Sequence, residues 1–257
     1  TAFRGVMKLH EYQAKDILRR FGIPVPKGYV ANSADEARQT AGKLDGPPWV
    51  VKAQVHTGGR GKGGGVQVVD TLEKVGSSAR AILSRPLITE QTGPEGKKVS
   101  RLLVEEGVEI GRELYLGIVV DRAAAMPAII FSQYGGMEIE EVAEKTPEAL
   151  FREFVPPESG WTPFIGKNLV YRLHPLLGPE ILKELTAVIR NLYHVFTDLD
   201  CSLAEINPLV ITKKGKVLAV DAKISIDDNA LFRQKDMQAL EDPMEKDPLE
   251  REAARYN

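Results

Sequence analysis

A glycine-rich segment at residues 58–65 lies between two short apolar runs, residues 49–55 and 66–69, and this arrangement restricts the possible fold most strongly. The segment holds six glycines together with Arg60 and Lys62. Because glycine has no Cβ, its backbone N–H groups can approach an anion closely, and the two basic side chains add positive charge. The pattern therefore predicts a strand, a phosphate-binding glycine loop and a second strand, with Lys52 on the first strand.

Three familiar phosphate-binding arrangements do not fit this segment. A dinucleotide fingerprint requires a helix that begins within the glycines, whereas a valine-rich run follows here. A P-loop requires Ser or Thr after its lysine, and Lys62 is followed by Gly63. A protein kinase would also carry His-Arg-Asp and Asp-Phe-Gly motifs, which the sequence lacks. A flexible glycine hairpin without a ligand remains the alternative.

Composition narrows the class of protein. The chain of 257 residues is 43% hydrophobic, enough to bury a sizeable core in two lobes. Its 34 basic and 36 acidic residues nearly cancel, so no overall field favours nucleic acid or an anionic membrane as a partner. Cys201 is the single cysteine, which excludes an internal disulfide and is typical of a reducing compartment. We expect a soluble, cytoplasmic protein, or one of the mitochondrial matrix if its source is eukaryotic.

Local patterns predict an α/β organisation. The first lobe is expected to combine two helices and two strands, over residues 9–21, 28–31, 33–44 and 49–55. A helix over residues 72–83 follows the glycine loop. We assign strands over 102–106, 113–120 and 127–131, and a long amphipathic helix that begins at Pro179, to the second lobe. Residues 1–6 are expected to be an extension, and the charged residues 236–257 an exposed linker or an unaccompanied helix.

Residues 202–212 and 216–224 predict an antiparallel hairpin around Lys213-Lys214-Gly215, with glycine at the left-handed position of the turn. If Thr212 pairs with Lys216, then Asn207 faces Asp221 and Glu205 faces Lys223, all on one face of the sheet. Oxygen ligands of this kind suit Mg²⁺. A solvent-exposed charged face is the alternative. Pro208 within the strand predicts an edge strand or a bulge, either of which could shift the register by one residue.

Several motifs together resemble one known family. They are Leu9 to Lys15, Val51 to Gly65, Glu113 to Gly117, Gly135 to Glu140, Glu205 to Pro208 and Asp228 to Gln234. In this order they resemble the β subunits of succinyl-CoA synthetase, from Met7 to the end of the chain. The resemblance implies an ATP-grasp fold of two lobes over residues 7–235, with nucleotide bound between the lobes. It also implies a further CoA-ligase-type domain, which is missing here, so that residues 236–257 would lead towards it.

The resemblance also implies roles for individual residues. Positions that match the nucleotide-binding residues are Lys52, Gly59, Arg60, Gly61, Glu105, Val108 and Glu113. Asn207 and Asp221 match the magnesium ligands. Glu205 matches the residue that accompanies a phosphohistidine of the α subunit when it visits the nucleotide, so it is the catalytic candidate here. The histidines of this chain, His10, His56, His174 and His194, are then expected to stay unphosphorylated.

The implied reaction joins succinate and CoA to succinyl-CoA, with ATP or GTP converted to a diphosphate and phosphate. The implied partner is the α subunit, and CoA and succinate would be held by parts absent from this chain. A malate-CoA ligase or a citrate-cleaving relative is the alternative within the resemblance. An alternative of another class is a nucleotide-binding interaction subunit without turnover of its own.

Overall fold

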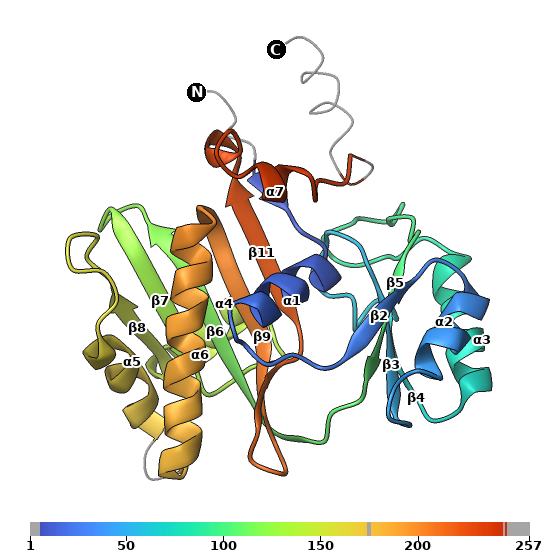
Figure 1. Cartoon of the computed structure of the whole chain (residues 1–257), viewed down its shortest axis with the longest axis horizontal. Helices are drawn as coiled ribbons and strands as arrows, with labels where there is room; N and C mark the ends of the chain where they lie inside the picture. The colour runs from blue at the N-terminus through green and yellow to red at the C-terminus, as the bar shows by residue number, and fades with distance from the viewer. Residues whose placement is uncertain (1–5, 174–175, 244, 246–257) are drawn as a thin grey trace. The chain divides into compact units, whose positions relative to one another are not determined.

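The computed structural model describes residues 6–173, 176–243 and 245 (Figure 1). The chain divides into two compact units. The small unit contains Pro26–Val108 and the described residues that follow Leu240, and the large unit contains Glu109–Ala239 and the described residues that precede Pro26. Each unit is built on its own antiparallel sheet.

The small unit is a four-stranded sheet with two helices packed against it. Its strands, in the order β2-β5-β3-β4, are β2 (Gly28–Ala31), β5 (Leu102–Glu106), β3 (Trp49–Ala53) and β4 (Val66–Val69). Its helices are α2 (Ala34–Ala41) and α3 (Leu72–Leu83). Both begin as their sequences predict, because the Ser33 and Thr71 hydroxyls accept hydrogen bonds from backbone N–H groups of the first turn. The glycine loop therefore connects two paired neighbours, β3 and β4.

Two elements belong to a different unit from the one that the sequence predicts. β5 was expected in the second lobe, but it lies between β2 and β3 of the small unit. Leu102, Leu103 and Val104 are all buried, so β5 is covered on both faces at these residues. Helix α1 (Glu11–Arg20) was expected in the first lobe, but it packs against strand β11 (Ala222–Asp227) and helix α6 (Pro179–Asp198) of the large unit.

The large unit contains a seven-stranded antiparallel sheet in the order β1-β11-β9-β6-β7-β8, with β10 paired to β9. The strands are β1 (Val6–Lys8), β6 (Ile110–Asp121), β7 (Met126–Ser132), β8 (Leu150–Phe154), β9 (Cys201–Thr212), β10 (Val217–Ala219) and β11 (Ala222–Asp227). The helices besides α1 are α4 (Ile139–Lys145), α5 (Pro163–Val170), α6 (Pro179–Asp198) and α7 (Lys235–Gln238). Short 3-10 turns cover Pro147–Ala149, Tyr171–Leu173 and Asp228–Ala230.

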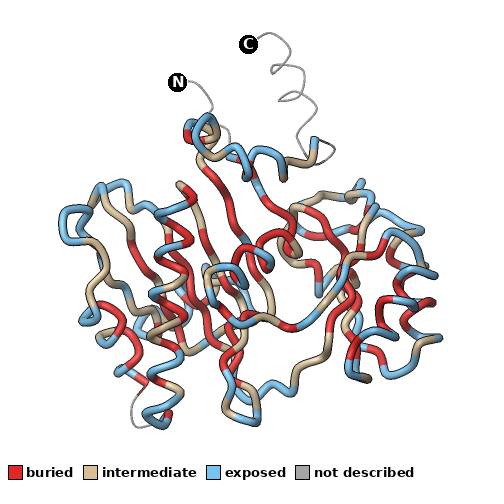
Figure 2. Tube along the Cα trace, viewed as in Figure 1, coloured by how far each residue is buried: buried red, intermediate tan, exposed pale blue. Residues whose placement is uncertain are grey.

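Helix α6 covers the sheet as its sequence predicts, beginning at Pro179 and contacting β9 and β6 (Figure 1). The predicted apolar stripe is buried at Leu185, Val188, Leu192 and Phe196. Buried residues also follow the central strands of the large sheet, whereas the outer strand β8 is largely half-buried or exposed (Figure 2). The functional candidates on β6 and β9 thus stand on two central strands that are paired on both sides.

The predicted hairpin register is confirmed. Glu205 pairs with Lys223, and the Asn207 N–H donates to the Asp221 carbonyl at 3.2 Å. Gly215 has a left-handed φ of +77°. Pro208 does not mark an edge, because β9 is paired on both sides. It instead marks a bulge against β6, where Asn207 and Pro208 together oppose a single residue.

The two ends of the chain differ from expectation where the structure describes them. Val6 was expected in an extension, but it begins β1 and pairs with Asp227. Past residue 235, Met237 is buried and Glu245 contacts Lys97, so this part is not a wholly exposed linker. Residues 1–5, His174 and residues 246–257 lie outside the described residues. Within the described ranges, no helix combines the length and the apolar character needed to cross a membrane.

Candidate functional site

The glycine loop is a compact turn that packs on the segment 87–91 of the small unit. Gly58 N donates to the Gln91 side chain at 2.7 Å, and a Cβ on Gly63 would lie 2.5 Å from the Ile88 carbonyl oxygen. Gly63, Gly64 and Gly65 donate their amides to carbonyls within the loop. In the described part of the chain, no hydrogen bond is made by the amides of Gly59 and Gly61, the two glycines predicted to bind phosphate. Those two amides are therefore available to an anion.

Arg60 lies buried within this loop. Its Nη1 donates to the Ala53 carbonyl oxygen at 2.9 Å, so the guanidinium joins the loop to the end of β3. Ala53 N in turn donates to the Gly65 carbonyl oxygen at 2.7 Å. Arg60 thus braces the loop in this conformation, which the sequence does not reveal. Its predicted contact with a phosphate is not part of this conformation and remains a prediction.

Lys52 and Glu105 form a buried ion pair between β3 and β5. The Lys52 ammonium lies 2.8 Å from Glu105 Oε2, and the two side chains are 5% and 2% exposed. The sequence presents both as nucleotide-binding candidates, and the structure brings them together beneath the glycine loop. Glu105 has room there because Gly28 on β2 lacks a side chain, and a Cβ at Gly28 would lie 2.6 Å from Glu105 Cγ.

Val108 follows β5 at the end of the small unit. Gly107 precedes it and donates to the Pro48 carbonyl oxygen at 2.7 Å, which holds this corner against the start of β3. Two buried polar atoms nearby, Trp49 Nε1 and Glu106 Oε1, have no hydrogen-bond partner among the described residues. The sequence of β5, three apolar residues followed by two glutamates, does not single out Glu106 in advance.

In the large unit, Glu205 on β9 is half-buried within a group of carboxylates. Burial raises the pKa of Glu205; Lys223 across the hairpin lowers it, and Asp221, Glu140 and Glu138 raise it further. Tyr115 on β6 lies beside this group. Burial and then the charges of Glu205 and Glu140 raise the pKa of its hydroxyl. The hairpin pattern predicts Glu205 and Asp221 together, but not Tyr115, Glu138 or Glu140.

Asn207 and Asp221 supply oxygen atoms at the predicted metal position. Asn207 Oδ1 accepts from Gly136 N at 2.7 Å, and Asp221 Oδ1 accepts from Ala222 N at 2.8 Å. An amide oxygen has two lone pairs, so this hydrogen bond leaves Asn207 able to bind a cation. One carboxylate and one amide oxygen suit Mg²⁺, which keeps several waters and nucleotide oxygens as further ligands. Among the residues that the structure describes, no group of three or more His, Cys, Asp or Glu side chains forms a ready-made metal site.

Glu113 on β6 lies against the loop that follows β7. Its carbonyl accepts from Gly135 N at 3.1 Å, and a Cβ on Gly136 would lie 2.9 Å from its Oε2. The large unit therefore brings together Glu113, Glu205, Asn207 and Asp221. The small unit brings together Lys52, Glu105, Arg60 and the two glycines whose amides make no hydrogen bond in the described part of the chain.

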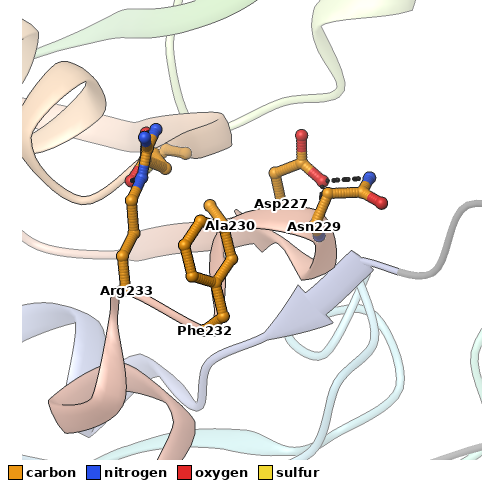
Figure 3. Close-up of a pocket in the computed structure, with 7 residues that line it drawn as sticks. Asp227, Asn229, Ala230, Phe232 and Arg233 are labelled. Atoms are coloured by element: carbon orange, nitrogen blue, oxygen red, sulfur yellow. Dashed lines mark hydrogen bonds and ion pairs between the residues drawn. The ribbon is translucent and has the colours of Figure 1, made fainter.

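A second feature of the large unit surrounds the motif at residues 228–234. A pocket of about 280 Å³ is lined by Asp200, Cys201, Asp227, Asn229, Ala230, Phe232 and Arg233 (Figure 3). Arg233 pairs with Asp200, whose pKa this guanidinium holds low, and Gln234 Nε2 donates to the same carboxylate at 2.8 Å. None of the predicted site residues lines this pocket. The motif thus lies directly after β11 and lines this pocket rather than the predicted site.

Comparison with known proteins shows the family to which the chain belongs. The ATP-grasp domain family matches residues 8–211. The chain is 49% identical over 251 residues to the β subunit of ADP-forming succinate–CoA ligase from Geobacillus kaustophilus, covering 98% of this chain and 64% of the relative. It is 51% identical over 253 residues to the same subunit from Acidobacterium capsulatum, covering 97% and 64%. The chain thus spans 64% of the length of these curated relatives.

The fold is shared with solved structures at lower identity. The ATP citrate lyase of Methanothrix soehngenii, in complex with citrate and coenzyme A, aligns with a TM-score of 0.70 at 18% identity. This alignment covers 95% of this chain and 57% of that chain. The family match extends from the last residue of β1 almost to the end of β9 and so includes strands of both sheets. The chain therefore belongs to the ATP-grasp domain family.

Proposed function

We propose that this chain is the nucleotide-binding, phosphoryl-transferring part of a succinate–CoA ligase β subunit. The proposed reaction converts succinate, CoA and a nucleoside triphosphate to succinyl-CoA, a nucleoside diphosphate and phosphate. The observation that carries the proposal is the buried Lys52 ammonium at the base of the glycine loop. It occurs in a chain about half identical to relatives that bear this name.

The small unit would bind the phosphates. Lys52 supplies a positive charge that is already desolvated, so its attraction to a phosphate is stronger than that of a surface lysine. The free amides of Gly59 and Gly61 add dipoles without a Cβ in the way, and Arg60 is the third predicted phosphate contact. Glu105 orients the lysine, and Val108 and Glu113 are the remaining predicted nucleotide contacts.

The large unit would hold the metal. Asn207 and Asp221 would bind Mg²⁺, which when bound neutralises charge on the phosphate oxygens. The protein's contribution to phosphoryl transfer is then positioning and electrostatics rather than covalent chemistry on this chain. Glu205 has the raised pKa of a partly desolvated carboxyl, so it can share a proton with an imidazole that comes close to it. We infer that it receives the phosphohistidine of the partner.

The proposal extends to partners and place of action. An α subunit would supply the reactive histidine, and a further domain beyond residues 236–257 would help to hold CoA and the acid. Either ATP or GTP fits the contacts proposed here. A cytoplasmic or mitochondrial-matrix location suits such a ligase.

Nucleotide titration tests the first half of the proposal. Lys52→Met is expected to abolish calorimetric binding of Mg²⁺-ATP or Mg²⁺-GTP, whereas Lys74→Met, which removes an exposed lysine paired with Asp70 in the same unit, should leave affinity unchanged. Asp221→Asn should weaken the Mg²⁺-dependent part of binding by about 1–3 kcal/mol. Equal affinities in all variants would refute the nucleotide site.

Phosphate transfer tests the second half. With γ-labelled nucleotide and an added α subunit, the label should appear on a histidine of that subunit and not on His10, His56, His174 or His194. Glu205→Gln should slow the transfer. Comparison of succinate, malate and citrate as acids, with the full-length subunits, separates the ligase from a malate-CoA ligase or citrate-cleaving enzyme. Nucleotide binding without any transfer would instead indicate an interaction subunit without turnover.

A further inference from the structure

The motif Gly135-Gly136-Met137 contacts the strands that carry the site, but no function has been assigned to it so far. We call it the 135–137 loop; it follows β7 and precedes α4 in the large unit. Gly135 N donates to the Glu113 carbonyl oxygen at 3.1 Å. Asn207 Oδ1 accepts from Gly136 N at 2.7 Å, and Asn207 Nδ2 donates to the Met137 carbonyl oxygen at 2.9 Å. The loop thus bridges β6 and β9.

Both glycines are required by this arrangement. A Cβ on Gly135 would lie 2.2 Å from the Leu114 carbonyl oxygen, which no side chain can tolerate. Gly136 has a φ of +73°, and its Cβ would lie 2.9 Å and 3.1 Å from the two carboxylate oxygens of Glu113. Any residue other than glycine at 136 would therefore be strained and would also displace the Glu113 carboxylate.

The two hydrogen bonds also determine which way the Asn207 amide points. Exchanging its oxygen and nitrogen would set a donor against the Gly136 N–H and an acceptor against the Met137 carbonyl. The side chain comes from the bulged part of β9, where the backbone ladder is locally interrupted. Its orientation is therefore set by the 135–137 loop rather than by its own strand.

We propose that Gly136 and the Met137 carbonyl are positioning groups, which hold Asn207 Oδ1 towards the metal and the Glu113 carboxylate towards the nucleotide. This inference rests on the proposed function, because Asn207 and Glu113 are ligands only within it. Groups that orient a metal ligand without touching the metal commonly change metal affinity by about 10–100-fold when they are lost.

Gly136→Ala tests the inference, with Gly215→Ala as the matched control. Both glycines have left-handed φ, but Gly215 lies in the β9–β10 turn, where a Cβ would meet nothing nearer than 3.9 Å. Affinity for ATP is measured by calorimetry in Mg²⁺ and in EDTA. We expect Gly136→Ala to weaken binding about 10–100-fold in Mg²⁺ and by a smaller factor in EDTA, where only the displaced Glu113 contact is lost. Gly215→Ala should leave both affinities within twofold of wild type. Equal affinities for the two variants in Mg²⁺ would overturn the inference.

A measurement without nucleotide examines the hydrogen bond between Gly136 and Asn207 itself. In Asn207→Ala the amide of Gly136 should exchange faster with solvent deuterium than in wild type, because it loses its acceptor. In Asn207→Asp one carboxylate oxygen can still accept from that amide while the other faces the Met137 carbonyl, so the Gly136 exchange rate should lie between those of wild type and Asn207→Ala. Unchanged Gly136 exchange in Asn207→Ala would overturn the inference even if Gly136→Ala failed to fold.

The two sets of experiments keep the two proposals apart. Wild-type protein that binds ATP equally in Mg²⁺ and in EDTA would refute the metal role of Asn207, and with it the positioning that we infer. Wild-type binding that depends on Mg²⁺, together with Mg²⁺ affinity unaltered in Gly136→Ala, would refute the positioning alone.

Discussion

Removing the positive charge of Lys52 should expose how strongly its buried ion pair is coupled to folding. Lys52 and Glu105 are 2.8 Å apart and at most 5% exposed. In Lys52→Met, the Glu105 carboxylate would lose this partner at a position where it is 2% exposed. Loss of one member of a buried pair typically costs about 3–5 kcal/mol. At about 2–4 °C per kcal/mol for a chain of this size, the melting temperature should fall by roughly 6–20 °C.

The double variant separates stability from function. Lys52→Met together with Glu105→Leu removes both charges and fills the space with apolar atoms, so its stability should return to within about 1 kcal/mol of wild type. Nucleotide binding should nevertheless stay absent, because no cation replaces Lys52. Lys74→Met is the control for a lysine pair on the surface, 59% and 65% exposed, and should cost less than about 1 kcal/mol.

Urea unfolding followed by tryptophan fluorescence provides the assay. The two tryptophans are Trp49, which is buried on β3 of the small unit, and Trp161 in the large unit. In a Trp161→Phe background the signal therefore reports the unit that holds the ion pair. A Lys52→Met cost below about 1 kcal/mol, or a double variant destabilised by the sum of its single changes, would refute the reasoning.

Four further predictions follow from individual contacts. Gly28→Ala should destabilise the small unit by about 1–3 kcal/mol in a urea titration, since its Cβ would lie 2.6 Å from Glu105 Cγ. Gly42→Ala is the control and should be tolerated, because its Cβ would have its nearest contact at 3.5 Å. Burial raises the pKa of Glu205 in the folded chain above its ordinary 4.5, so folding takes up a proton between the two values and stability falls as pH rises through that window. The melting temperature should therefore change less with pH between pH 4 and 8 in Glu205→Gln than in wild type. An equal pH dependence in the two proteins would contradict the assignment. Burial and then Asp200 raise the pKa of the Cys201 thiol to about 12, so iodoacetamide should alkylate it at pH 8 in urea but not in the native protein, as mass spectrometry would show. Amides of residues 58–65 should exchange more slowly once nucleotide is bound, and equal exchange with and without saturating nucleotide would remove the glycine loop from the site.

Local signals in the sequence predict most helices and strands of this protein. Ser33 begins α2, Pro179 begins α6, and Gly215 makes the turn of the hairpin, as each pattern indicates. The pairing of Glu205 with Lys223 follows from that turn alone. Such features are predictable because they depend on residues only a few positions apart, whose φ angles and hydrogen bonds are determined locally.

The family and its candidate residues were also accessible from the sequence, because motifs in a given order are far more specific than any one glycine loop. It remains a prediction that Lys52 and Glu105 bind nucleotide, that Asn207 binds the metal and that Glu205 is catalytic. The structure adds the reason for their arrangement within each unit. Lys52 meets Glu105 over Gly28, and Asn207 meets the 135–137 loop.

Only the tertiary structure decided which sheet each strand joined. β5 looks like a neighbour of β6 along the chain, but it pairs with β2 and β3, while α1 packs on β11, which lies some 200 residues later in the sequence. The bulge at Pro208, the bracing of Arg60 against Ala53 and the carboxylates around Glu205 likewise depend on partners distant in sequence. Such partners are chosen by the packing of whole sheets, because burial of apolar area and pairing of backbone groups are optimised over the entire unit rather than along any one segment.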